Sequence, residues 1–150
     1  MKLYLILIPC LYITGCTEEK MPRAEHPTNI KMKQEAKEIF KDKLEDERSF
    51  RSYAEHQVLY EIQANKLTLK EFEYLTTHDI AAKQWKFYKK INQGYIFCRN
   101  KQQLEVIPPQ VLVGNEVLGK GDVGLQYEND WNIFLLSPAS AGIYVCYSES

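Results

Sequence analysis

The spacing of apolar residues changes near residue 80, and this change limits the folds that the chain can adopt. Before it, apolar residues recur every three or four positions, which is typical of helices that bury one face. After it, short apolar runs alternate with polar residues and are bounded by Gly, Pro, Asn or Asp, which is typical of antiparallel strands. We therefore expect an α+β protein, in which an N-terminal helical segment (30–78) precedes a small antiparallel β-sandwich or barrel (79–150) with one disulfide.

Three helices are expected in residues 30–78. The first, in residues 30–48, either packs a narrow stripe on the domain or binds a partner, and the small number of heptads favours packing. The stripe is Met32, Ala36, Phe40 and Leu44. A second series with the same spacing predicts a helix over 50–65, and it consists of Phe50, Ala54, Val58 and Ile62. Thr68 and Glu71 have the spacing of a capping box, which predicts a third helix that ends near Thr77.

Eight short segments after residue 80 are predicted to be strands. They are QWKFYKKI, GYIFCR, QLEVI, PPQVLV, NEVL, VGLQY, WNIFLL and GIYVCY. Pro108 and Pro109 cannot both lie in a central strand, because proline cannot donate to the ladder, so we expect a corner or an edge of the sheet there.

The N-terminus has the pattern of an export signal. Lys2 precedes an apolar run from Leu3 to Ile13, which is too short to cross a bilayer as a helix. The next residues, Ile13-Thr14-Gly15-Cys16, resemble the lipobox of bacterial lipoproteins. The resemblance implies that residues 1–15 are a signal peptide, that Cys16 carries the lipid, and that 16–29 form a flexible tether. The alternative is an ordinary secretory signal with a coincidental cysteine.

The lipoprotein resemblance also implies a location. Thr, rather than Asp, follows Cys16, which in enteric lipoproteins favours the outer membrane. We therefore expect a chain anchored by lipid in the cell envelope, at the outer membrane and facing the periplasm. Cys10 then lies in the discarded peptide.

Two cysteines remain in the C-terminal half. Because an exported chain folds in an oxidising compartment, a disulfide between Cys98 and Cys146 is expected. The alternative is two buried free thiols.

SAGIYVC, residues 140–146, resembles the sixth-strand signature of immunoglobulin-type domains. The resemblance implies that Tyr144 is the corner tyrosine, with its hydroxyl bonded to nearby backbone, and that Cys98 lies on the partner strand. Ser140 replaces the usual Asp, and no Trp follows Cys98 at the family's spacing. The resemblance therefore supports only a β-sandwich with a disulfide.

The sequence carries no motif for catalysis, a metal or a cofactor, so we expect a protein that is not an enzyme and binds no cofactor. His26 falls in the tether, His56 on a helix surface and His78 at a turn, and none has metal-ligand spacing. The formal net charge of −1 gives no basic field for nucleic acid. No small-molecule substrate is indicated.

A basic and aromatic cluster is the one candidate partner surface. Its members are Lys83, Trp85, Lys86, Tyr88, Lys89 and Lys90. The cluster is either the solvent face of a strand, which we favour, or a patch for an acidic partner or lipid headgroups.

The most consistent function is binding to another protein. In size, anchor and β domain the chain is similar to small bacterial immunity lipoproteins that neutralise periplasmic toxins. The competing hypothesis is a structural accessory lipoprotein of a secretion, pilus or conjugation system, or a phage exclusion lipoprotein. The genes beside this one would separate the two.

Overall fold

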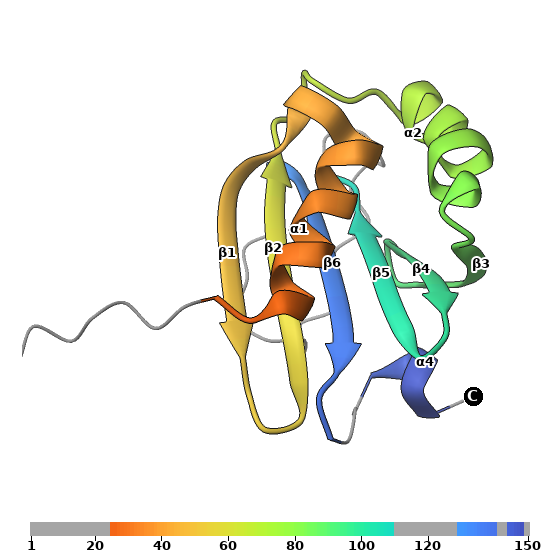
Figure 1. Ribbon diagram of the computed structural model, residues 1–150. Helices are drawn as coiled ribbons and strands as arrows, with labels where there is room; N and C mark the ends of the chain where they lie inside the picture. The colour runs from red at the N-terminus through yellow and green to blue at the C-terminus, as the bar shows by residue number, and fades with distance from the viewer. Residues whose placement is uncertain (1–24, 110–128, 141–143, 149–150) are drawn as a thin grey trace, which may run out of the picture.

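A computed structural model describes residues 25–109, 129–140 and 144–148, and their strands form one six-stranded sheet (Figure 1). The strand order is β1-β2-β6-β5-β4-β3, and every neighbouring pair is antiparallel. The strands are β1 (Glu45–Arg51), β2 (Glu55–Ile62), β3 (Lys86–Ile91), β4 (Gly94–Arg99), β5 (Gln102–Ile107) and β6 (Trp131–Pro138). The helices are α1 (Pro27–Phe40), the 3₁₀ turn η1 (Lys41–Lys43), α2 (Leu69–Leu75), the π-helical η2 (Thr76–Ile80) and α4 (Val145–Ser148).

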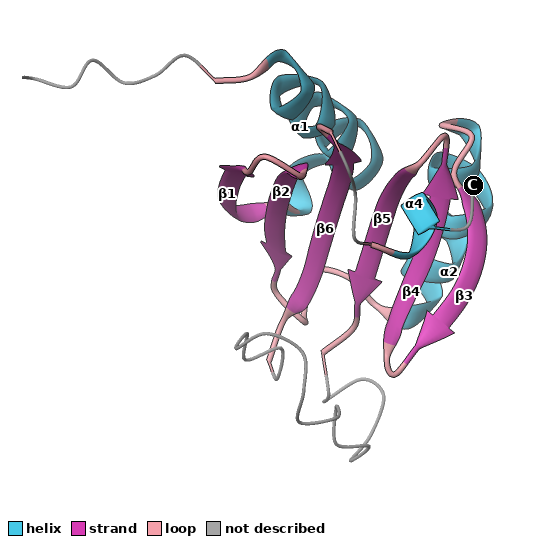
Figure 2. Ribbon diagram, turned by 90° about the horizontal axis from the view of Figure 1, so that it is seen from below, coloured by secondary structure: helices cyan, strands magenta, loops and turns pink. Residues whose placement is uncertain are grey.

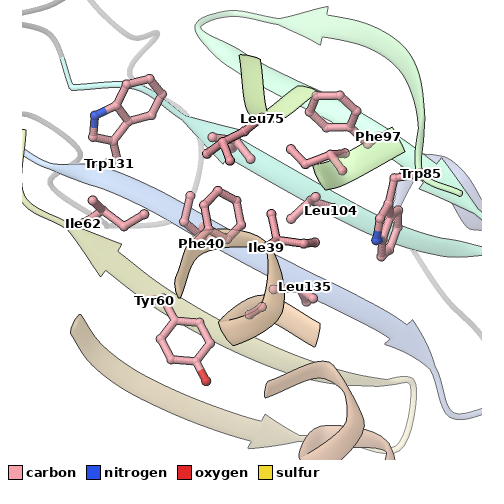
Figure 3. Packing of buried hydrophobic residues seen from close by; sticks show 14 of the residues in the cluster. Ile39, Phe40, Tyr60, Ile62, Leu75, Trp85, Phe97, Leu104, Trp131 and Leu135 are labelled. Carbon is pink, nitrogen blue, oxygen red and sulfur yellow. The ribbon is translucent and has the colours of Figure 1, made fainter. Parts of the chain in front are cut away.

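Helices cover both faces of the sheet. α1 lies along β2 and β6 (Figure 1), and α2 contributes Phe72 and Leu75 to the same core. Ile39 and Phe40 of α1 lie at the centre of this core (Figure 3). α4 packs against β4 and β5 on the opposite face (Figure 2), where a smaller apolar cluster lies. β6 is buried on both faces from Trp131 to Ser137.

The N-terminal boundary differs from the sequence expectation. α1 begins at Pro27, and the side chain of His26 accepts a hydrogen bond from the Thr28 amide, which caps the helix. Asn29 is buried, so residues 25–29 belong to the fold rather than to the expected tether. α1 ends at Phe40, where Lys41 adopts a positive φ of 58°. The turn η1 and the start of β1 replace the rest of the helix expected over 30–48.

The helix expected over 50–65 is wrong, because these residues form the end of β1 and all of β2. Val58 and Ile62 are four residues apart, but they also have the same parity, and Tyr60 lies between them. The three side chains lie in the core between the sheet and the helices. Apolar residues therefore recur here every two positions, as in a strand, and the spacing of four was two strand repeats. The expected boundary at 78/79 does not separate the strands, since β2 pairs with β6.

The third helix is confirmed. Thr68 Oγ1 accepts from the Glu71 amide, and the Glu71 carboxylate accepts from the Thr68 amide at 2.8 Å, which completes the predicted capping box.

The expectation of a sandwich or barrel is corrected, because the described strands form one open sheet with β1 and β3 as its edges. Pro108 and Pro109 follow the end of β5. The strands expected in 110–113, NEVL and VGLQY lie outside the described residues.

The Cys98–Cys146 disulfide is present, with a Cα–Cα distance of 5.5 Å. The immunoglobulin-like strand around it is wrong where the structure describes it, because Val145–Ser148 is the helix α4. The buried hydroxyl of Tyr144 has no hydrogen-bond partner among the described residues, so the corner-tyrosine role is wrong as well. The bridge instead ties α4 to β4, on the face of the sheet opposite α1.

Candidate functional site: a groove beside the β3 edge

The structure divides the predicted basic and aromatic cluster. Trp85 is buried, whereas Lys86, Tyr88 and Lys90 are exposed on β3. Lys83 lies before the strand, and its ammonium group pairs with Glu38 of α1. The six residues therefore do not form one surface.

Trp85 belongs to a buried polar cluster that joins α1 to β4. Its indole Nε1 donates to Glu35 at 2.8 Å, and Arg99 Nη2 donates to the other carboxylate oxygen at 2.9 Å. The Arg99 guanidinium also lies over the Trp85 ring, 4.3 Å from its centroid. Glu35, a buried charged residue of α1, thus accepts hydrogen bonds from two residues in distant parts of the chain.

A β-bulge decides which β3 side chains face the helices. The register shifts between Phe87 and Lys89, so Phe87 pairs with Phe97 and Lys90 pairs with Tyr95. Phe97 and Tyr95 pack in the helical core, which places Phe87 and Lys90 on the helix side. Lys86 pairs with Cys98 and Lys89 with Ile96, which places these two lysines on the opposite side.

A groove of about 720 Å³ lies between the α2–η2 segment and the β3–β4 hairpin. Its volume is in the range of sites that hold small molecules or anchor side chains. Its walls are mainly apolar, with polar groups from both sides. The lining residues are Leu69, Phe72, Glu73, Thr76, Thr77, Ala81, Trp85, Phe87, Lys90, Gln93, Tyr95 and Phe97.

The aromatic wall of the groove is held by ring contacts. Phe72 of α2 meets Tyr95 edge-on, with centroids 5.0 Å apart, and Phe87 meets Phe97 at 5.7 Å. Phe87 nevertheless remains 57% exposed. The groove is therefore bordered by an exposed apolar ring.

The opposite wall is formed partly by η2, whose wider π-helical turn follows α2 directly. Such turns are frequent at functional sites. The Thr76 and Thr77 hydroxyls lie at this wall and donate to backbone carbonyls of the preceding turn. His78 stacks on Tyr74, with centroids 3.9 Å apart, and contacts the Tyr74 carbonyl, so its role is local to the turn.

A second feature, which the sequence reasoning missed, is a pair of stacked histidines at the start of α1. The rings of His26 and His56 lie 4.1 Å apart, although the residues are on different elements. The Asn29 side-chain nitrogen donates to Ser49 and to two carbonyls, which leaves its oxygen to accept from His56 Nδ1 at 3.0 Å. Burial, followed by the charges of His26 and Arg51, lowers the pKa of His56.

The described residues contain no group of three or more His, Cys, Asp or Glu side chains that could hold a metal ion. None of the helices in the described ranges has the length and apolar character needed to cross a bilayer. Comparison with protein-family models, with curated proteins and with solved structures returned no match.

Proposed function

We propose that this chain is a lipid-anchored protein of the bacterial cell envelope, at the outer membrane and facing the periplasm, that acts by binding another protein. The groove beside β3 is the observation that carries the binding role. It combines an aromatic wall with an exposed ring at Phe87, and aromatic residues are enriched at the cores of protein interfaces. Lys90 adds a cation at the border of the groove.

The N-terminal sequence supports the proposed location. The lipobox-like Ile13-Thr14-Gly15-Cys16 follows a short apolar run, and the Cys98–Cys146 bridge suits an oxidising compartment. A periplasmic toxin is the class of partner that this layout favours, which would make the chain an immunity protein.

The anchor is tested by Cys16→Ala. This variant should accumulate as the unprocessed precursor and take up no labelled palmitate, because it lacks the thiol that accepts the lipid. Cys10→Ala is the control and should be processed and labelled like the wild type. Equal labelling of the Cys16 variant contradicts the anchor.

The binding site is tested by a photo-crosslinking amino acid at position 87, compared with position 50. Both positions hold an exposed phenylalanine on an edge strand, 57% and 53% exposed, but only Phe87 borders the groove. In cells that carry the native neighbouring genes, a defined adduct should form at position 87 and not at position 50.

Thr77→Trp fills the groove from the η2 wall and should remove this adduct, while leaving the thermal unfolding midpoint within a few degrees of the wild type. Lys70→Trp places the same bulk on the exposed α2 surface outside the groove lining and should keep the adduct. Adducts that are equal at both positions, or that persist in Thr77→Trp, contradict a binding role for the groove.

A further inference from the structure

We infer that the groove receives an extended partner segment that adds to the outer edge of β3, and that this segment alternates apolar with acidic side chains. The inference rests on the proposed binding function and specifies the partner's conformation and chemistry. Main-chain hydrogen bonds to an edge strand supply affinity in this mode, and pockets for alternate side chains supply specificity.

The position of β3 provides the edge. β3 is the last strand in the sheet order and pairs only with β4 among the described strands. Five of its six residues are exposed. Alternate N–H and C=O groups of an edge strand point away from the sheet, where an added strand can pair with them.

The two sides of β3 differ in chemistry, and this determines the side chains of the added strand. On the helix side, Phe87 and Lys90 border the groove, so alternate residues of the added strand would enter an aromatic space. On the other side, Lys86 and Lys89 flank the path of the strand. Carboxylates at the intervening positions would therefore lie opposite lysines.

The other edge of the sheet does not offer the same site. β1 reads EDERSFR, with three acids and two arginines, and three of its charged residues, Glu45, Glu47 and Arg48, form ion pairs with neighbouring elements. Arg48 pairs with Glu61 at 3.0 Å, and Glu45 pairs with Lys66. β3 reads KFYKKI and carries three lysines and no acid, so an acidic segment distinguishes the two edges.

A second copy of this chain is a poor occupant of the β3 edge. Two β3 strands placed edge to edge would bring lysines of like charge together, which is destabilising. A heterologous acidic strand does not meet this repulsion, because its carboxylates would lie near the lysines of β3.

The test uses the full chain in detergent and four synthetic hexapeptides. The first alternates Leu and Glu, and the second alternates Leu and Lys. The third and fourth are Leu–Glu peptides with N-methyl groups on alternate amides, each along a different edge. We expect the Leu–Glu peptide to bind about fivefold or more tightly than the Leu–Lys peptide. Methylation of the edge that meets β3 should weaken binding about tenfold, and methylation of the other edge should have little effect.

Hydrogen exchange locates the bound peptide. The amides of Lys86–Ile91 should gain protection with the Leu–Glu peptide, whereas those of Glu45–Arg51 should not. Lys86→Glu combined with Lys89→Glu should reverse the preference between the two charged peptides. Lys31→Glu combined with Lys70→Glu changes the net charge equally, at exposed helix positions, and should leave the preference unchanged.

The outcomes separate this inference from the proposed function. If Thr77→Trp blocks binding but β3 gains no protection and methylation has no effect, the groove binds its partner by another mode and strand addition is wrong. If Thr77→Trp changes neither the binding of the peptides nor the formation of the adduct at position 87, the proposed function itself is wrong. If the Leu–Glu and Leu–Lys peptides bind equally, the partner segment is not acidic. If the chain without peptide forms dimers joined through β3, the occupant of this edge is a second copy of the chain.

Discussion

Replacing Arg99 by Leu should destabilise the protein strongly, because it leaves the Glu35 carboxylate buried without its cation. Within the described part of the chain, Glu35 would then keep only the Trp85 indole as a donor. Removing one partner of a buried ion pair costs 3–5 kcal/mol, and the side chains here are 17% and 10% exposed, so we expect about 3 kcal/mol. With a urea m-value of about 2 kcal/mol/M, the unfolding midpoint should fall by about 1.5 M.

The control is Arg48→Leu, which removes an exposed ion pair with Glu61. The Arg48 side chain is 46% exposed, so this variant should lose less than about 1 kcal/mol. Adding Glu35→Leu to Arg99→Leu should recover part of the loss, because the double variant contains no unpaired buried charge. The reasoning is refuted if the two arginine variants lose equal stability, or if the double variant loses at least the sum of the single variants.

Three further effects on stability are expected from urea unfolding. Removing both Cys98 and Cys146 opens a bridge across 48 residues and should cost about 4 kcal/mol in the chain-entropy model; a loss below about 1 kcal/mol would contradict this. Thr68→Ala removes the cap of α2 and should cost about 1 kcal/mol, and an unchanged midpoint would count against the capping role. Because the folded state lowers the pKa of His56 below its usual value of 6.5, this group's contribution to stability should be complete above pH 6.5 and should fall as the pH drops below it. The His56→Gln variant should therefore lose less stability than the wild type between about pH 7.5 and 5.5. Parallel curves of stability against pH for the two proteins would refute the assignment.

Local patterns were enough to predict several parts of the fold. The capping box at Thr68 and Glu71 and the strands Lys86–Ile91 and Gly94–Arg99 depend on neighbouring residues, and the structure contains all of them. The disulfide was predictable from the expected compartment and the number of remaining cysteines.

Other parts depend on which distant segments pair. Val58 and Ile62 satisfy both helical and strand periods, so only the pairing of β2 with β6 identifies the segment as a strand. The stack of His26 on His56 likewise requires β2 to lie under the start of α1.

The groove also depends on the contact of segments that are distant in the sequence. Its two walls come from α2–η2 and from β3–β4, and no short stretch of sequence contains both. The basic cluster pointed to β3, but the sequence did not show that Trp85 turns inward to Glu35.

The place of β6 in the sheet has a consequence for the order of folding. β6 follows β5 in the chain, yet it lies between β2 and β5 and joins the β1–β2 hairpin to the β3–β4–β5 meander. A nascent chain that lacks β6 has two sheet fragments with no strand between them, and the core under α1 cannot close. Stable structure is thereby postponed until β6 has been synthesised, and this delay is compatible with the proposed export of the chain in an unfolded state.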